Sequence, residues 1–301
     1  MITDQARANV PAARLMGALG MFRVVPEGLR GVPRIPFAIF VLFVAVAVVG
    51  PYITPQDPFQ QSLQTRLAPP AWAGGSTDNL LGTDSLGRDV LSRLMKGARI
   101  ALAIGVTTAI AAGILGAALG MIAGFSGGAI DYLLMRLTDG MIAMPFLVVA
   151  LAIAVVLPPS IKTLVAILIF FGWAGYARII RSTVLQLREA EFIQLAKVAG
   201  CSSRRILWRH ISPNVTNTFV VLFTLQLATV IIAEASLSFL GMGVPPPEPS
   251  WGLMLSDGRR FVDTAWWISV FPGVAITLVV LSVNMLGDWL RVRLDPKFRQ
   301  V

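Results

Sequence analysis

Long uncharged stretches dominate the hydrophobic pattern of the chain. They occupy residues 35–56, 100–130, 140–161, 163–177, 211–233 and 264–287. A membrane-spanning helix needs about 20 predominantly apolar residues, and every stretch but the fourth reaches that length. The fourth becomes long enough if the side chain of Arg178 extends to the interface. The pattern predicts six spans, at about 35–53, 100–124, 133–157, 163–181, 215–239 and 267–288.

Composition supports an integral membrane protein of the all-α class. Of the 301 residues, 55% are hydrophobic and only 14% are charged, whereas a soluble domain carries about 25% charged residues. The net charge of +9 does not indicate nucleic-acid binding, because the basic residues lie between apolar runs. Cys201 is the single cysteine and His210 the single histidine, which excludes a disulfide framework and a His-rich metal site. The first stretch follows a basic leader too long for a signal peptide, so we expect an uncleaved anchor.

Basic residues predict the orientation of the spans. Six spans place both termini on one side of the membrane, and 17 of the 25 Lys and Arg residues lie on that side. Cytoplasmic loops carry an excess of Lys and Arg, so we expect both termini in the cytoplasm of a multi-pass protein of the cell membrane. A basic cluster at residues 88–99 departs from this rule, since it lies on the predicted outer side.

The segments between the spans then divide into a cytoplasmic lead 1–34, an external loop 54–98, a cytoplasmic loop 182–213 and an external segment 240–266. Apolar spacing over 87–98 predicts an amphipathic helix at the interface, capped by Thr83, Asp84 or Ser85. Tryptophans at 251, 266 and 267 are typical of interfacial anchors, with substrate contact as the alternative.

The cytoplasmic loop 182–213 predicts a helical hairpin. Phe192, Leu195, Ala196 and Ala199 share one face of a short helix that ends at Gly200, a residue that favours the left-handed turn at a helix end. Ser202 or Ser203 caps a second helix, which we expect to stop at Pro213. An apolar face with small residues suits docking into a groove of a partner, and a hairpin lying passively on the membrane is the alternative.

Two features inside the spans carry candidate roles. Glu234 is the one carboxylate expected well inside a span, and either lines a pathway or makes a structural pair. Gly116, Gly120 and Gly124 are spaced by four residues on the second span and predict close helix packing, with a hinge as the alternative.

At these residues the chain resembles a known family. Ala196, Gly200 and Pro213 match the spacing of the coupling loop of permeases in importers of the ATP-binding-cassette (ABC) class, while Gln194, Leu195 and Ser212 depart from its usual residues. The stretch LGTDSLGRDVLSR at 81–93, with 97–99, is similar to the C-type subunit of dipeptide/oligopeptide permeases. Stretches 236–243, 249–252, 284–288 and 294–296 extend this similarity over most of the chain.

The resemblance implies the type I ABC importer permease fold and half of a transmembrane pathway for di- or oligopeptides. It implies a heterodimer with a B-type permease, two ATPase subunits that hold ATP and Mg, and an external peptide-binding protein. Together with the apolar face and the charges of the hairpin, it leads us to expect ATPase coupling through residues of the loop 182–213: Phe192, Leu195, Ala196, Lys197, Ala199, Gly200, Arg204, Arg205 and Pro213.

The chain itself has no phosphate-binding loop motif, so we expect it to bind no cofactor and to hydrolyse no ATP. A self-sufficient secondary carrier and a membrane enzyme are the competing classes. The first requires more buried charges, and the second a nucleophile with its base. The substrate stays open among dipeptides, oligopeptides, glutathione and nickel complexes.

Overall fold

The computed structural model describes residues 31–294 of the chain. Most of the predicted lead 1–34, and the basic residues Lys297 and Arg299 near the C-terminus, lie outside the described residues.

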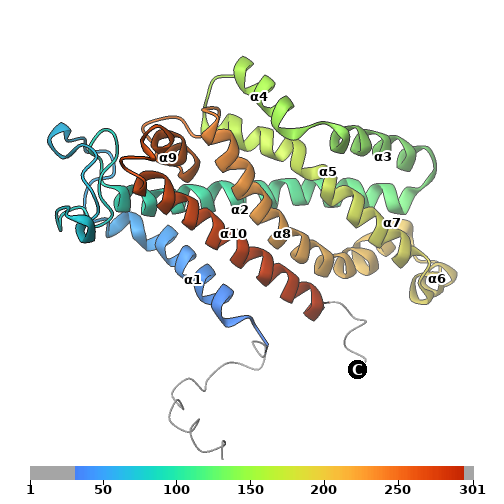
Figure 1. Cartoon of the computed structure of the whole chain (residues 1–301). Helices are drawn as coiled ribbons and strands as arrows, with labels where there is room; N and C mark the ends of the chain where they lie inside the picture. The colour runs from blue at the N-terminus through green and yellow to red at the C-terminus, as the bar shows by residue number, and fades with distance from the viewer. Residues whose placement is uncertain (1–30, 295–301) are drawn as a thin grey trace, which may run out of the picture. The chain divides into compact units, whose positions relative to one another are not determined.

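The described residues fold almost entirely into helices (Figure 1), which confirms the all-α class. An isolated bridge between Thr83 and Asp89 is the β-type pairing found among them. The helices are α1 (Arg34–Val49), α2 (Val90–Ser126), α3 (Gly128–Ala143), α4 (Phe146–Val156), α5 (Ile161–Arg188), α6 (Glu191–Val198), α7 (Ser203–Ile206), α8 (Ser212–Phe239), α9 (Trp251–Gly258) and α10 (Trp267–Leu294).

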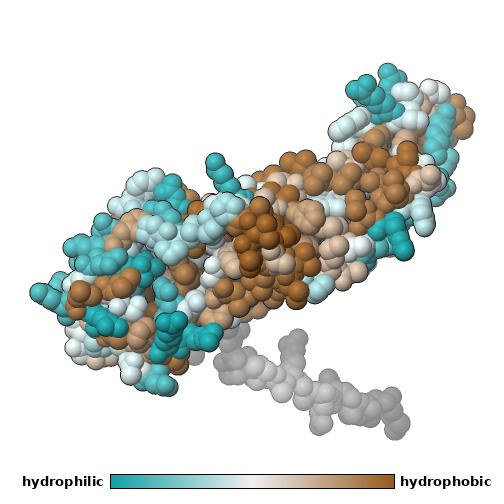
Figure 2. Space-filling model, turned by 90° about the horizontal axis from the view of Figure 1, so that it is seen from above, coloured by the Kyte–Doolittle hydropathy of each residue, from teal (hydrophilic) through white to brown (hydrophobic). Residues whose placement is uncertain are grey.

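Five continuous helices among the described residues are long and apolar enough to cross a membrane: Arg34–Tyr52, Val90–Ser126, Ile161–Arg188, Ser203–Phe239 and Trp267–Leu294. A sixth span exists only if the bent pair α3 and α4 counts as one. Apolar residues gather over the middle of one face of the molecule, and hydrophilic residues are more frequent toward its two ends (Figure 2). This distribution is the one expected of a protein that spans a bilayer.

The third predicted span, 133–157, is not one straight helix. It is broken between Ala143 and Phe146, where α3 and α4 meet at 87°. The reason is Pro145, because a proline disfavours helical dihedrals in the residue before it. Met144 accordingly adopts an extended conformation with ψ 131°. The span was predicted from the length of the uncharged run 140–161 alone. Pro145 within that run was the residue that could have indicated the bend.

The start of α2 also differs from the prediction. No separate interfacial helix precedes the second span in the described residues, since α2 runs without a break from Val90 to Ser126. Its N-cap is Asp89, whose side chain accepts a hydrogen bond from the backbone N–H of Ser92 at 2.8 Å. An N-cap carboxylate satisfies one of the free N–H groups of the first turn, so neither Thr83, Asp84 nor Ser85 caps this helix.

Three glycines of α2 lie against the backbone of α5. A Cβ added at Gly116 would overlap the carbonyl oxygen of Trp173, and one at Gly120 would lie 2.5 Å from that of Ala177. At Gly124 the nearest atom would be the carbonyl oxygen of Arg181, at 2.9 Å. Such distances are too short for any side chain. The spacing of four residues therefore sets how closely the two helices approach.

Two ends of the bundle differ in what they contain (Figure 1). We call residues 51–89 together with α9 the loop end. We call residues 189–211, which include α6 and α7, the hairpin end.

Candidate functional site

The hairpin turns at Gly200. This residue has φ +75°, as the sequence predicts, and it follows the end of α6 in a Schellman arrangement. The N–H of Cys201 donates to the carbonyl of Ala196 at 3.0 Å, and the N–H of Gly200 donates to that of Lys197 at 3.0 Å. These two bonds satisfy carbonyls that the end of a helix leaves free. The turn thus requires a residue that tolerates positive φ.

The second arm of the hairpin continues into the membrane helix. Ser202 caps α7 by accepting a hydrogen bond from the N–H of Arg205 at 3.4 Å. A π-helical segment, Leu207–Ile211, then joins α7 to α8, so that Ser203–Phe239 forms one helix of 37 residues.

The expectation that Pro213 ends the second arm is therefore wrong. Pro213 lies in the first turn of α8, directly after the widened π-helical segment, where a missing N–H is tolerated. The carbonyl of His210 accepts a hydrogen bond from the side chain of Asn214 at 2.6 Å. Because the helix does not stop, the hairpin is attached rigidly to a candidate span.

One side of the hairpin packs onto the bundle. Ile193 of α6, Ile206 of α7 and Ile211 are at most 2% exposed and form a cluster that also includes Val215. Ala196 is partly buried against this cluster, so it lies at the edge of the predicted docking face. Ile193 was not among the residues that the helical pattern singled out, although its spacing of three residues from Ala196 places the two on one side of the helix.

The other side of α6 exposes apolar residues. Phe192 is 43% exposed, Leu195 68% and Val198 87%, and Ala199 is exposed as well. The charged candidates of the hairpin, Lys197, Arg204 and Arg205, are exposed beside them. Within a helix of eight residues this is an apolar surface that nothing in the described part of the chain covers. We call Phe192, Leu195, Val198 and Ala199 the hairpin face.

The loop end has the opposite character, because it buries charged side chains. Asp84 is 3% exposed and accepts hydrogen bonds from the backbone N–H groups of Leu86 (2.8 Å) and Arg88 (3.0 Å). The Nε of Arg88 donates to the same carboxylate at 2.6 Å, and the Nε of Arg93 lies 3.5 Å from it. Buried charges persist when they are paired and hydrogen-bonded in this way.

This network connects the external loop to α9. A second nitrogen of the Arg88 guanidinium lies 3.4 Å from the carboxylate of Asp257. Burial raises the pKa of the Asp257 carboxyl, and the charges of Arg88 and Arg93 oppose that rise. Arg88 and Arg93, which belong to the basic cluster that departs from the orientation rule, are thus paired with neighbouring carboxylates.

Two tryptophans that were interpreted as interfacial anchors are buried instead. Trp251 is 3% exposed and donates from Nε1 to the carbonyl of Leu94 at 2.9 Å. Trp267 is 5% exposed and donates to the carbonyl of Thr83 at 3.0 Å. Both indoles bind the backbone around the start of α2, because a buried Trp needs a partner for its N–H. Trp266 alone among the three is exposed, at 42%.

Glu234 lies inside the bundle, 1% exposed. Its carboxylate accepts a hydrogen bond from Ser238 Oγ at 2.7 Å, and the same hydroxyl accepts one from the backbone N–H of Val244 at 3.1 Å. This pairing ties the end of α8 to the segment that follows it. The geometry favours the structural interpretation of Glu234 over the pathway interpretation.

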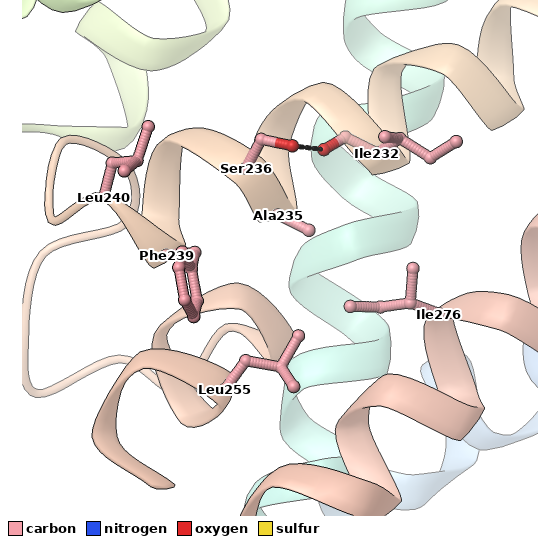
Figure 3. Close-up of a pocket in the computed structure, with 7 residues that line it drawn as sticks. All are labelled: Ile232, Ala235, Ser236, Phe239, Leu240, Leu255 and Ile276. Atoms are coloured by element: carbon pink, nitrogen blue, oxygen red, sulfur yellow. Dashed lines mark hydrogen bonds between the residues drawn. The ribbon is translucent and has the colours of Figure 1, made fainter. Parts of the chain in front are cut away.

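A groove of about 310 Å³ lies between α8, α9 and α10 (Figure 3). Its walls come from Ile232, Phe239, Leu255 and Ile276, and the hydroxyl of Ser236 donates to the carbonyl of Ile232 at 2.8 Å. Glu234 is not among the residues that line the groove. The residues from 31 to 294 contain no cluster of His, Cys, Asp and Glu suited to a metal ion.

Comparison with known proteins identifies relatives over most of the chain. Residues 116–300 match the family described as binding-protein-dependent transport system inner membrane component. Residues 35–70 match the N-terminal TM domain of oligopeptide transport permease C.

The chain is similar to three permease proteins in particular. It is 43% identical over 265 residues to the dipeptide transport system permease protein of Escherichia coli (strain K12), covering 88% of each chain. It is 39% identical over 259 residues, 86% of each chain, to a di/tripeptide transport system permease protein of Pseudomonas aeruginosa (strain UCBPP-PA14). It is 40% identical over 266 residues, 88% of each chain, to a putative peptide transport system permease protein of Brucella suis biovar 1 (strain 1330).

Proposed function

The chain belongs to the family of binding-protein-dependent transport system inner membrane components, and we propose that it is a permease subunit of an ATP-driven ABC importer for di- or oligopeptides. It is a multi-pass membrane protein with the fold expected of such a permease. The proposal that the substrates are peptides rests on the names of relatives that are about 40% identical to this chain. In this proposal the chain forms half of the pathway, and a B-type permease forms the other half as its heterodimer partner.

The observation that carries the proposal is the hairpin face. Phe192, Leu195, Val198 and Ala199 expose apolar surface at the tip of a helix pair that is packed onto the bundle by Ile193. Exposed apolar surface of this kind marks a site for a partner. An ATPase subunit with a groove for a short helix is the partner that supplies what this chain lacks, since the sequence has no phosphate-binding loop motif.

Movement of the hairpin has a direct route into the membrane. The helix Ser203–Phe239 is continuous, so a displacement of its first turns is carried along α8 as a rigid-body motion. In this proposal ATP and Mg stay on the two ATPase subunits, and the chain contributes no catalytic group of its own. Lys197, Arg204 and Arg205 are exposed and orient the docking, each exposed ion pair contributing less than about 1 kcal/mol.

The position of Ala196 sharpens the test of coupling. Ala196→Trp disturbs the packing against Ile193 and Ile206 as well as the approach of a partner, because Ala196 lies between them and the hairpin face. Leu195→Asp is the cleaner variant, since Leu195 is 68% exposed. Surface substitutions of that kind leave the fold intact.

The proposal also includes an orientation, with the hairpin end in the cytoplasm and the loop end outside. The test uses a Cys201→Ser background with a cysteine introduced at Asp78 or at Val198, both exposed. A membrane-impermeant thiol reagent added to intact cells should modify position 78 and leave position 198 unmodified. The reverse labelling pattern would overturn the orientation.

Glu234 gives a test of the pathway alternative. Because its carboxylate is buried and bound to Ser238, we expect Glu234→Gln to lower thermal stability while peptide uptake per folded transporter stays unchanged. Loss of uptake by a variant of wild-type stability would assign Glu234 to the pathway instead.

The proposal as a whole is tested by purification and reconstitution. The tagged chain should bring down a second permease and ATPase subunits, and the complex in vesicles should take up peptides only with ATP and the binding protein. Peptide transport by the chain alone, without ATP, would instead establish a self-sufficient carrier.

A further inference from the structure

A second cavity lies at the bend between α3 and α4. It encloses about 210 Å³ between these helices, α5 and α8, and a cavity of roughly 150 Å³ suffices for a benzene ring. Its walls are mostly apolar, and include Met141, Met144, Phe146, Phe171, Gln226 and Ala233. The cavity is therefore large enough for an aliphatic or aromatic side chain of a ligand.

One wall of this cavity carries an amide. Gln226 lies against Gly172, where an added Cβ would come within 3.2 Å of the Gln226 Nε2, so the absence of a side chain at position 172 leaves room for the amide. A side-chain amide both donates and accepts hydrogen bonds. It can therefore bind the N–H or C=O of a peptide backbone beside the apolar walls.

An exposed ion pair lies close to the cavity along the same helices. Arg178 of α5 donates to Asp139 of α3, and the two side chains are 49% and 57% exposed. Arg178 belongs to a candidate membrane span, where charges facing lipid are costly and charges facing a water-filled space or a protein are the rule. The ion pair thus marks the end of this face of α3 and α5 that reaches the interface or a polar space.

The cavity and the ion pair share one continuous face. Asp139 precedes the cavity residue Ile142 by three positions, and Arg178 follows the cavity residue Phe171 by seven, and both spacings return to the same side of a helix. Between them a Cβ added at Gly140 or at Gly175 would meet no atom within 4 Å. Nothing in the described part of the chain covers this surface.

We propose that this face is the peptide-contacting surface of the pathway, in which the cavity holds an apolar side chain and Gln226 binds the peptide backbone. Arg178 and Asp139 complement the carboxylate and ammonium that a short peptide carries at its ends. The inference rests on the proposed function and adds the chemistry of the ligand, which is a zwitterionic peptide with an apolar side chain.

The test compares two substrates in the reconstituted complete transporter. Initial rates of ATP-driven uptake are measured for dileucine and diglycine with the wild type, Ala233→Phe and Gln226→Met. Ala233→Phe fills the cavity, so the ratio of dileucine to diglycine uptake should fall about tenfold, the size expected for a lost apolar pocket. Gln226→Met keeps the side-chain length, and uptake of both peptides should fall about fivefold, the size of one neutral hydrogen bond.

Val220→Phe is the matched control, since Val220 is an exposed residue of the same helix outside the cavity, and its substrate ratio should equal that of the wild type. An unchanged ratio in Ala233→Phe would overturn the inference and leave a cavity filled by lipid. An equal fall for both peptides in that variant would also overturn it, since this is the signature of disturbed packing. A wild-type transporter that imports neither these dipeptides nor longer peptides would refute the proposed function itself.

Discussion

The two ends of the bundle differ in which side chains they bury and which they expose. At the loop end Asp84 and Arg88 are at most 7% exposed, and Asp84 pairs with Arg88 and with the buried Arg93 of α2. At the hairpin end Leu195 and Val198 are more than half exposed although both are apolar. The loop end therefore pairs its buried charges within the chain, although it also exposes single apolar side chains such as Leu63 and Trp72. At the hairpin end the exposed apolar residues gather on one short helix, as a surface for a partner.

This difference suggests that the loop end stabilises the fold and that the hairpin end binds a partner. Buried ion pairs are costly to break from one side, because the remaining charge loses its partner, so the loop end holds the start of α2 in a single arrangement. An exposed apolar face does not stabilise the isolated chain and is available for binding a partner. We expect substitutions at the loop end to change the stability of the chain, and substitutions on the hairpin face to weaken its binding to a partner subunit.

The largest effect is expected at the loop end. Asp84→Asn removes the charge that faces Arg88 and Arg93 and should destabilise the chain by about 3–5 kcal/mol. Thermal unfolding of the purified protein in detergent measures this as a marked fall in Tm. The control is Asp78→Asn, because Asp78 is exposed and binds only its neighbour Ser76 among the described residues. Equal Tm values for the two variants would remove the distinction between the ends.

A smaller effect is expected in the helices that connect the two ends. Gly120→Ala places a Cβ 2.5 Å from the carbonyl oxygen of Ala177 and should cost about 1–3 kcal/mol through overpacking. Gly140→Ala is its partner variant, since a Cβ there meets nothing within 4 Å, and it should be neutral or slightly stabilising. The two melting curves decide whether α2 and α5 are in contact as described. A fall in Tm confined to Gly140→Ala would contradict that packing.

At the hairpin turn the expected effect is smaller again. Gly200→Val forces a β-branched residue to φ +75°, and the left-handed conformation costs about 1–2 kcal/mol. Gly200→Asn should restore most of the loss, because asparagine tolerates that conformation. Limited proteolysis near residue 200 follows the local opening. Equal cleavage of Val and Asn variants would show that the turn does not depend on the sign of φ.

The sequence was sufficient for the features that depend on local pattern. Uncharged length predicted five continuous membrane helices, and Gly200 with Ser202 or Ser203 predicted the turn and the cap of the hairpin, because these signals act over a few residues. The four-residue spacing of Gly116, Gly120 and Gly124 likewise pointed to close packing, although not to α5 as the neighbour.

Features that depend on distant residues were out of reach. The burial of Trp251 and Trp267 depends on backbone carbonyls of residues 94 and 83, which no local pattern connects to them. The continuation through Pro213 required the π-helical segment before it. The bend at Pro145 was within reach, since the proline is visible in the sequence, but the hydrophobic run concealed it.

The most direct test of the account is a pair of measurements on Leu195→Asp. This variant alters the hairpin face and no buried contact. Its free energy of unfolding should therefore change by no more than about 0.5 kcal/mol, as is typical of surface positions, with a correspondingly small shift in Tm. ATP-driven peptide uptake by the complete transporter should nevertheless fall at least tenfold, with loss of the ATPase subunits on purification. Wild-type uptake and ATPase association in this variant would contradict the assignment of the hairpin face as the contact through which the ATPases act.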